Sequence, residues 1–290
     1  YGTALLGKAG SVINDASGII NIGESSQGMY FKDEGAPLNI FTNNGQLLSS
    51  STDTVGMYLD NPTSTIITNT GTINLTGDKS RGIYITNNGA TTVTNTGNIT
   101  VGGSSVINDP SIGIYSENST DTINNTGNIT AGVNSLGIYS KTAIVNHLSG
   151  TIKVGDNGTA IYSDQGNITI GSGATITLGT KNAVAAYGIN SSSIANSSNI
   201  NIGNDNYGFI IQSGSTLVNN GAGNLGEDSV FAYSNNGVSI INNAGGTINM
   251  TGSNNIAFYM NGGSIVNNEK INGTIGTSNI GIASIGGSVT

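Results

Sequence analysis

The chain has 290 residues, no cysteine and a formal net charge of −8, and only 8% of its residues are charged. This acidic balance argues against binding of nucleic acid and docking to anionic lipid, because both need clustered cations. Without cysteine there is no disulfide framework, and since no apolar run reaches about 18 residues we expect no direct membrane insertion by this segment.

The first recurring element along the chain is a short Gly-Ile-Tyr burst, which is clearest at 82–84, 113–115 and 137–139. Apolar and aromatic residues alternate around it, which is typical of a half-buried strand. Successive bursts lie 23 to 31 residues apart, with a mean of about 26. The third position of the burst falls at Tyr1, Tyr30, Tyr58, Tyr84, Tyr115, Tyr139, Tyr162, Tyr187, Ile210, Tyr233, Tyr259 and Ala283.

Two further strand-like bursts follow the first in most repeats. One ends in asparagine, and the other is a short apolar run such as 99–101. Gly and Asn separate the bursts, and both residues take positive φ at low cost. Because the markers recur together, one supersecondary unit repeats along the chain. The asparagines that end the second burst are Asn14, Asn43, Asn69, Asn95, Asn124, Asn146, Asn196, Asn219, Asn242 and Asn267.

Three short strands per repeat, with no 3.6-residue periodicity, predict an all-β fold. The architecture we expect is a right-handed parallel β-helix of about 11–12 coils of ~26 residues, each coil burying its apolar face on the next. Residues 1–290 then form a single β-helical repeat domain. Neither end reads as the polar cap that a solenoid needs, so we expect the domain to be excised from a longer solenoid at both ends.

The recurring asparagines and tyrosines each have a structural and a functional interpretation. Stacked Asn amides can bond to one another where strands turn corners, which we favour over a sugar-binding role. If the residue before each Tyr faces the core, the tyrosines form an outward stripe that could stack sugars or meet a protein. Alternatively, they stack between coils and only stabilise the rod. The candidate binding tyrosines are Tyr30, Tyr58, Tyr84, Tyr115, Tyr139 and Tyr162.

Two insertions are the other candidate binding features. The longest interval between bursts holds Asn108 and Asp109, and an earlier long interval holds Asp33 and Glu34. Insertions in repeat proteins map to loops, often on the binding face. A tolerated surface loop is the simpler interpretation of both.

The sequence predicts no enzyme. Its acids are scattered: neighbours such as Glu227 and Asp228 would point to opposite faces of a strand, and Asp156 and Asp164 cannot be placed relative to each other. The single histidine, His147, follows an asparagine where other repeats carry a turn residue, so we predict a plain turn position. Calcium-binding Gly-Gly-x-Gly-x-Asp repeats are absent. We therefore expect no catalytic residue, no metal and no cofactor.

The amino-acid sequence of the repeats resembles that of a known family. Asn-Thr-Gly-Asn-Ile-Thr at 95–100 and 125–130, with the Gly-Ile-Tyr bursts, resembles passenger domains of Gram-negative autotransporters, above all the large fusobacterial type V adhesins. The resemblance implies a stalk on the extracellular cell surface, joined in the full-length chain to a C-terminal outer-membrane β-barrel. It also implies adhesion to host cells or other bacteria, through a surface protein or glycan. The alternatives are a purely structural stalk and a polysaccharide-cleaving β-helix enzyme.

Overall fold

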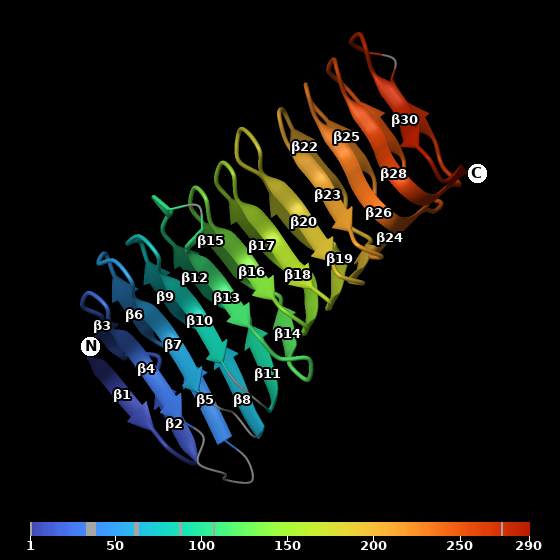
Figure 1. The fold of residues 1–290 in the computed structure, drawn as a ribbon. Coiled ribbons are helices and arrows are strands. Elements are labelled where there is room, and N and C mark those ends of the chain that lie inside the picture. Colours follow the sequence, from blue (N-terminus) through green and yellow to red (C-terminus); the bar gives the residue numbers. More distant parts are fainter. Residues whose placement is uncertain (1, 33–38, 61–63, 87–88, 107, 274) are drawn as a thin grey trace.

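The protein is a parallel β-helix, which confirms the predicted fold class. A computed structural model describes residues 2–32, 39–60, 64–86, 89–106, 108–273 and 275–290. Its 31 strands pair in parallel with the coil before and the coil after, in about 11 turns of roughly 25 residues. The coils stack into a rod with the two chain ends at opposite ends (Figure 1). The described part of the chain contains no helix, and hence none that could span a membrane.

The first of three strand columns carries the tyrosines and faces the viewer in Figure 1. Strands β26 and β28 run from this first sheet into the second. The first sheet comprises β1 (Thr3–Gly7), β4 (Gln27–Lys32), β7 (Val55–Asp60), β10 (Arg81–Thr86), β13 (Ile112–Ser116), β16 (Leu136–Ser140), β18 (Thr159–Asp164), β20 (Val184–Ile189), β23 (Tyr207–Gln212), β26 (Val230–Asn242), β28 (Ile256–Asn267) and β30 (Ile280–Ile285).

The second and third sheets complete each coil, and β17 and β19 run through both. The second sheet adds β2 (Ser11–Asn14), β5 (Asn39–Asn43), β8 (Ser64–Asn69), β11 (Ala90–Asn95), β14 (Thr122–Asn125), β17 (Ile144–Val154), β19 (Asn167–Thr177), β21 (Ser193–Asn196), β24 (Thr216–Asn219) and β31 (Ser288–Val289). The third sheet adds β3 (Ile19–Asn21), β6 (Gln46–Ser49), β9 (Thr72–Leu75), β12 (Asn98–Val101), β15 (Asn128–Ala131), β22 (Ile200–Gly203), β25 (Gly223–Leu225), β27 (Ile248–Met250) and β29 (Ile271–Asn272).

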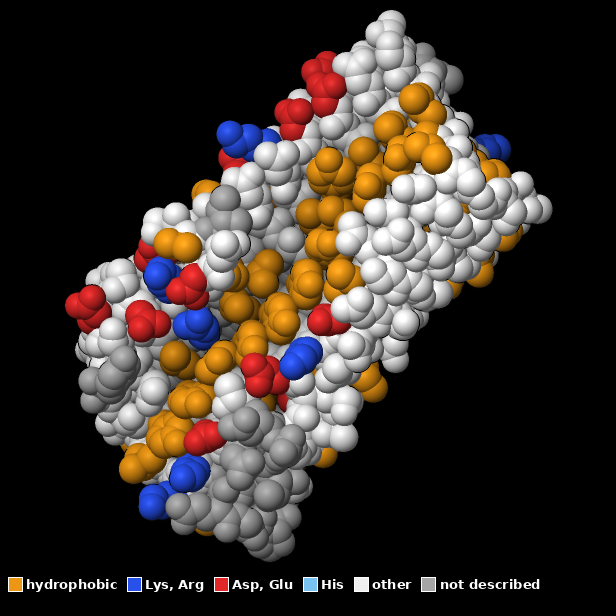
Figure 2. All heavy atoms as spheres, viewed as in Figure 1, with side chains coloured by type: hydrophobic (Ala, Val, Ile, Leu, Met, Phe, Trp, Pro, Cys, Tyr) orange, Lys and Arg blue, Asp and Glu red, His pale blue; other side chains and the backbone are white. Residues whose placement is uncertain are grey.

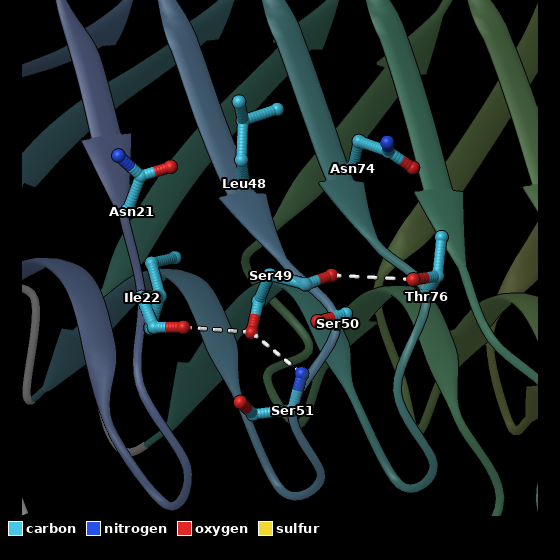
Figure 3. Close-up of a pocket in the computed structure, with 8 residues that line it drawn as sticks. All are labelled: Asn21, Ile22, Leu48, Ser49, Ser50, Ser51, Asn74 and Thr76. Carbon is cyan, nitrogen blue, oxygen red and sulfur yellow. Dashed lines mark hydrogen bonds between the residues drawn. The ribbon is translucent and has the colours of Figure 1, made fainter.

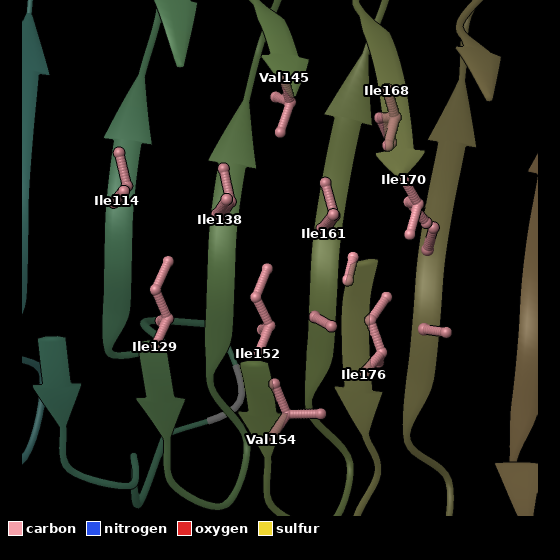
Figure 4. Packing of buried hydrophobic residues seen from close by; sticks show 14 of the residues in the cluster. Ile114, Ile129, Ile138, Val145, Ile152, Val154, Ile161, Ile168, Ile170 and Ile176 are labelled. Atoms are coloured by element: carbon pink, nitrogen blue, oxygen red, sulfur yellow. The ribbon is translucent and has the colours of Figure 1, made fainter. Parts of the chain in front are cut away.

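The core is a set of aliphatic columns that run along the rod. In the first sheet Ile114 pairs with Ile138, and Ile138 with Ile161, and all three side chains are fully buried (Figure 4). Ile129 and Ile152 form the matching column of the third sheet. Each coil therefore buries its apolar side chains against identical or similar ones above and below, which is the stacking that the repeat predicts.

A buried asparagine ladder runs along the corner after the second sheet, as the sequence predicts. The Nδ2 of each Asn donates to the Oδ1 of the next, and the Asn43–Asn69 bond, for example, measures 2.8 Å. The first series ends at His147 and the second starts at Asn196, because Ile170 occupies the position between them. The ladder residues are Asn14, Asn43, Asn69, Asn95, Asn125 and His147, followed by Asn196, Asn219, Asn242 and Asn267.

Two of the predicted ladder positions were wrong by one residue. The prediction that His147 occupies a plain turn was also wrong. Asn124 and Asn146 bond to each other on the outer side, at 3.0 Å. Asn125 and His147 are buried in their place, and Asn125 Nδ2 lies 3.0 Å from His147 Nδ1. Counting two residues on from the buried Ile123 selects Asn125, so strand alternation identifies the inward residue where the first asparagine of the pair does not.

Candidate functional site

The tyrosines of the first sheet lie one above another and face outward, and we call this column the tyrosine stripe. Ile83 is buried and the following Tyr84 is partly exposed, which decides the orientation that the sequence left open. Neighbouring rings from Tyr30 to Tyr187 have centroids 4.7 to 5.3 Å apart. The tyrosine stripe comprises Tyr30, Tyr58, Tyr84, Tyr115, Tyr139, Tyr162, Tyr187, Ile210, Tyr233 and Tyr259.

A second outward column, three residues before each tyrosine, widens the stripe. Two consecutive inward residues separate the two columns, as Gly137 and Ile138 separate Leu136 from Tyr139. Figure 2 shows the result as a nearly continuous hydrophobic band along the long axis of the rod. This flanking column is largely apolar, and it was not predicted from the sequence although its apolar members recur with the repeat. Its partly exposed apolar members are Val55, Leu136, Tyr207, Val230 and Ile256, whereas Ile112 and Val184 in the same column are buried, at 5% and 7% exposure.

The tyrosine hydroxyls point away from the flanking column, toward polar residues at the other margin of the sheet. Tyr30 donates to Asp60 at 3.1 Å and Tyr187 donates to Gln212 at 2.9 Å. Burial raises the pKa of Tyr30 to about 12, and the hydrogen bond to Asp60 adds to the effect. Burial also raises the pKa of Tyr162 to about 12. The stripe therefore offers neutral phenols, each with an apolar ring face and a polar edge.

A shallow hollow of about 250 Å³ opens beside the stripe in the middle of the rod. Tyr139 and Tyr162 line it with rings 5.2 Å apart and nearly parallel, while Asn134 and Asn157 border it. The two Asn amides bond to each other at 3.0 Å. The hollow thus combines stacked aromatic rings with amide groups at the edge, which suits the burial of an apolar side chain or a sugar ring.

The insertion that holds Asn108 and Asp109 is tied back to the preceding coil. Asp109 lies 3.2 Å from both Arg81 and Lys79. The Arg81 guanidinium also sits over the Tyr84 ring, 5.4 Å from its centroid. These contacts give Asp109 a structural role in anchoring the loop, whereas Asn108 is exposed on it. Asp33 and Glu34, the other predicted insertion residues, lie outside the described residues.

A hollow of about 370 Å³ on the third sheet is lined mainly by small polar side chains, together with Ile22 and Leu48 (Figure 3). Ser49 Oγ donates to the carbonyl of Ile22 at 2.8 Å and accepts from the backbone of Ser51 at 3.1 Å. Thr76 Oγ1 donates to the Ser49 carbonyl at 3.4 Å. These hydroxyls are engaged in joining neighbouring coils, so they serve the corner of the fold.

The titratable groups that could serve catalysis lie on separate parts of the rod. Asp164 ends β18 and Asp156 lies in the turn before it, so the two acids stand at opposite margins of the first sheet. His147 is fully buried in the asparagine ladder. Among the described residues, no group of three or more His, Asp or Glu side chains could hold a metal ion. No family model, curated protein or solved structure matches this chain.

Proposed function

We propose that this chain is a rod-shaped segment of a surface-displayed adhesin of the autotransporter passenger type, and that it meets its partner through the tyrosine stripe and the flanking column. The observation that carries the proposal is the length of the stripe: aromatic and aliphatic side chains stay outward and in register over the stacked coils of the first sheet. Contiguous exposed apolar surface of this kind marks interaction sites.

The chemistry of tyrosine supports this role. Its ring gives a large contact area and has only two side-chain torsions to order, and its hydroxyl adds a hydrogen bond, so tyrosine is enriched at interfaces and among binding hot spots. The ring contacts within the stripe hold each side chain before a partner arrives. Preorganised groups lose less entropy on binding. We propose no catalytic activity, because the acids are distributed along the margins of the sheet.

A structural stalk is the second candidate, and a specific observation favours it. The tyrosines stack on one another and several hydroxyls bond within the rod, so they stabilise the fold without any partner. A glycan-cleaving enzyme is the third candidate. A reducing-sugar assay on a broad polysaccharide panel separates it from the other two, and release of reducing ends would contradict the proposal.

Binding of the purified chain to host cells, bacteria and a glycan array tests the adhesive role. The double variant Tyr139→Ala/Tyr162→Ala should lose about tenfold or more in binding, as expected for two central aromatic anchors. The matched control is Ile66→Ala/Ile144→Ala, which removes side chains 41% and 40% exposed on the second sheet. The control should bind like the parent. No binding by the parent chain, or equal losses in both variants, would leave the stalk as the function.

A further inference from the structure

Acidic residues follow the margins of the stripe along the rod. The turn before the first sheet carries most of them, and Figure 2 shows acidic side chains bordering the hydrophobic band. Near residues 53–109 these acids face cations: Arg81 lies 3.6 Å from Asp53 and 3.2 Å from Asp109. The acids in this turn are Glu24, Asp53, Asp78, Asp109, Asp156, Asp205, Glu227 and Asp228.

Along the C-terminal half of the stripe, the acids at the margins have fewer cations beside them. Between residues 156 and 261 five acids flank the stripe against a single cation, Lys181. In this described stretch none of the five forms an ion pair. Their hydrogen bonds are instead to neutral groups, such as Asn190 to Asp164 at 2.7 Å and Asn254 to Asp228 at 3.0 Å. The five acids are Asp156, Asp164, Asp205, Glu227 and Asp228.

These carboxylates are accessible to a partner. Asp205, Glu227 and Asp228 are exposed, and Asp156 is partly exposed. The backbone N–H and hydroxyl of Thr180 hold the pKa of Asp156 below its usual range. The C-terminal half of the stripe is therefore an apolar and aromatic strip with negative charge at both margins, because Asp164 stands on the side opposite the other four.

We propose that the C-terminal half of the stripe, from β18 to β28, docks a cationic amphipathic helix of a partner protein. The apolar face of that helix would lie on the tyrosines and the flanking column, with its Lys and Arg side chains toward the acidic margins. This inference rests on the proposed function and names the chemistry of the partner. Complementary charge at the rim gives such a contact its orientation and its selectivity.

A helix fits this surface better than an added strand does. The backbone groups of β18, β20 and β23 are engaged by the coils on both sides, so the face offers side chains and no free strand edge. A helix satisfies its own backbone and presents an apolar stripe flanked by charges. A neutral sugar chain could stack on the rings and donate its hydroxyls to the carboxylates, but it would leave their negative charge uncompensated, whereas a cationic helix neutralises it.

The test uses the whole chain and two synthetic peptides of about 18 residues, ~27 Å long as helices. Both carry the same leucine face, flanked by lysine in one and by glutamate in the other, and fluorescence anisotropy gives each dissociation constant at low and at raised salt. The lysine peptide should bind, more weakly as salt rises, and the glutamate peptide should not. The triple variant Asp164→Asn/Asp205→Asn/Asp228→Asn should raise the dissociation constant of the lysine peptide about tenfold, as expected for the loss of three exposed ion pairs.

The matched control, Asp15→Asn/Glu269→Gln, neutralises two acids away from the first sheet and should leave binding unchanged. Equal affinity for both peptides, or an equal loss in the control variant, would overturn the inference. One outcome is that cell adhesion is lost in the Tyr139→Ala/Tyr162→Ala variant yet unchanged in the triple acid variant. That result would overturn the inference of a cationic helix, while the proposed function would stand. Absence of cell adhesion by the parent chain, with selective binding of the lysine peptide, would instead refute the proposed function alone.

Discussion

His147 shows how one residue makes the asparagine ladder sensitive to pH. The ring is fully buried, with Asn125 Nδ2 3.0 Å from Nδ1 and the Thr175 carbonyl 3.4 Å from Nε2. Since the amide donates to Nδ1, the neutral ring must carry its proton on Nε2. A second proton on Nδ1 would face the amide hydrogens of Asn125 and oppose that bond.

We predict that His147 lowers the free energy of unfolding in mild acid. Burial lowers the pKa of His147 below 6.5, so the unfolded chain takes up a proton that the folded chain refuses. The neutral His147 ring therefore gives the folded state its full stability above pH 6.5. That stability is lost as the pH falls from 6.5 toward the lower pKa of the folded state. Urea unfolding of the parent and of His147→Asn at pH 7.5 and pH 5 measures it. The variant should lose less stability between the two values, and an equal loss would contradict the assignment.

Asp121, the residue just before β14, acts in the opposite direction. Its carboxylate accepts from Ser116 Oγ at 2.7 Å and from the Thr91 backbone at 2.9 Å, and burial raises its pKa to about 6 from 3.8. The folded state therefore holds the proton more tightly, and stability falls as pH rises from 3.8 to about 6. Asp121→Asn keeps both bonds, since its amide can donate to Ser116.

We predict that Asp121→Asn stabilises the rod at pH 7 by about 1–3 kcal/mol, the scale of a shift of roughly two pKa units. The gain should shrink toward pH 4, where the parent carboxyl is already protonated. Thermal unfolding at both pH values measures it. A loss of stability at pH 7 would show that the charged form is the one that the fold requires.

At the residue scale the sequence predicted the tyrosine and asparagine columns but not every member. Period-two alternation put Tyr84 on the face opposite Ile83 but did not say which of the two residues faces the core, and the structure puts Ile83 inside. His147 was misplaced because nothing in one sequence marks an imidazole as a substitute for an amide in a ladder. The flanking column was missed because two consecutive inward residues, such as Gly137 and Ile138, break strict alternation.

At the scale of elements, the corner between the second and third sheets sets how closely successive coils can approach each other. At Gly97, which follows the asparagine ladder, an added Cβ would lie 2.1 Å from the Gly71 carbonyl oxygen. The same approach recurs at Gly71 over Gly45 and at Gly127 over Gly97. The Gly71 carbonyl oxygen is held by the Asn98 N–H at 3.0 Å and cannot move aside freely, so glycine is the residue that fits at these three positions.

We predict that Gly97→Ala costs about 1–3 kcal/mol of unfolding free energy, the usual price of overpacking. The matched control is Gly23→Ala, whose added Cβ has nothing within 4 Å and should change stability by less than about 0.5 kcal/mol. Chemical denaturation of both variants measures the difference. Equal stabilities would mean that the corner relaxes freely.

The strands themselves were predicted more completely than their ends. Sequence breaks at Gly and Asn imply three separate strands per coil, yet β17, β19, β26 and β28 continue around a corner. In β26 the pairing register shifts between Asn235 and Val238, and Asn236 and Gly237 have positive φ. Such a bulge keeps the strand paired while it bends, and residue type alone does not distinguish it from a chain break.

For the whole molecule, the stacking of coils determines both stability and the proposed function. A coil contacts mainly its two neighbours, so the rod grows by repetition and spans roughly 50 Å at about 4.8 Å per step. The same stacking turns one outward tyrosine per coil into a surface long enough to meet a partner. Cysteine is absent from the chain, so engineered thiols can report this geometry without interference.

Pulsed electron paramagnetic resonance on spin labels at Tyr58→Cys and Tyr187→Cys tests this arrangement most directly. The two positions are five coils apart in one column. Stacking in register predicts backbone positions about 24 Å apart, and a label distance near that value broadened only by the label arms. It also predicts rapid labelling, because the side chains face outward. A much shorter or very broad distribution, or thiols that label only after unfolding, would contradict a continuous outward tyrosine stripe.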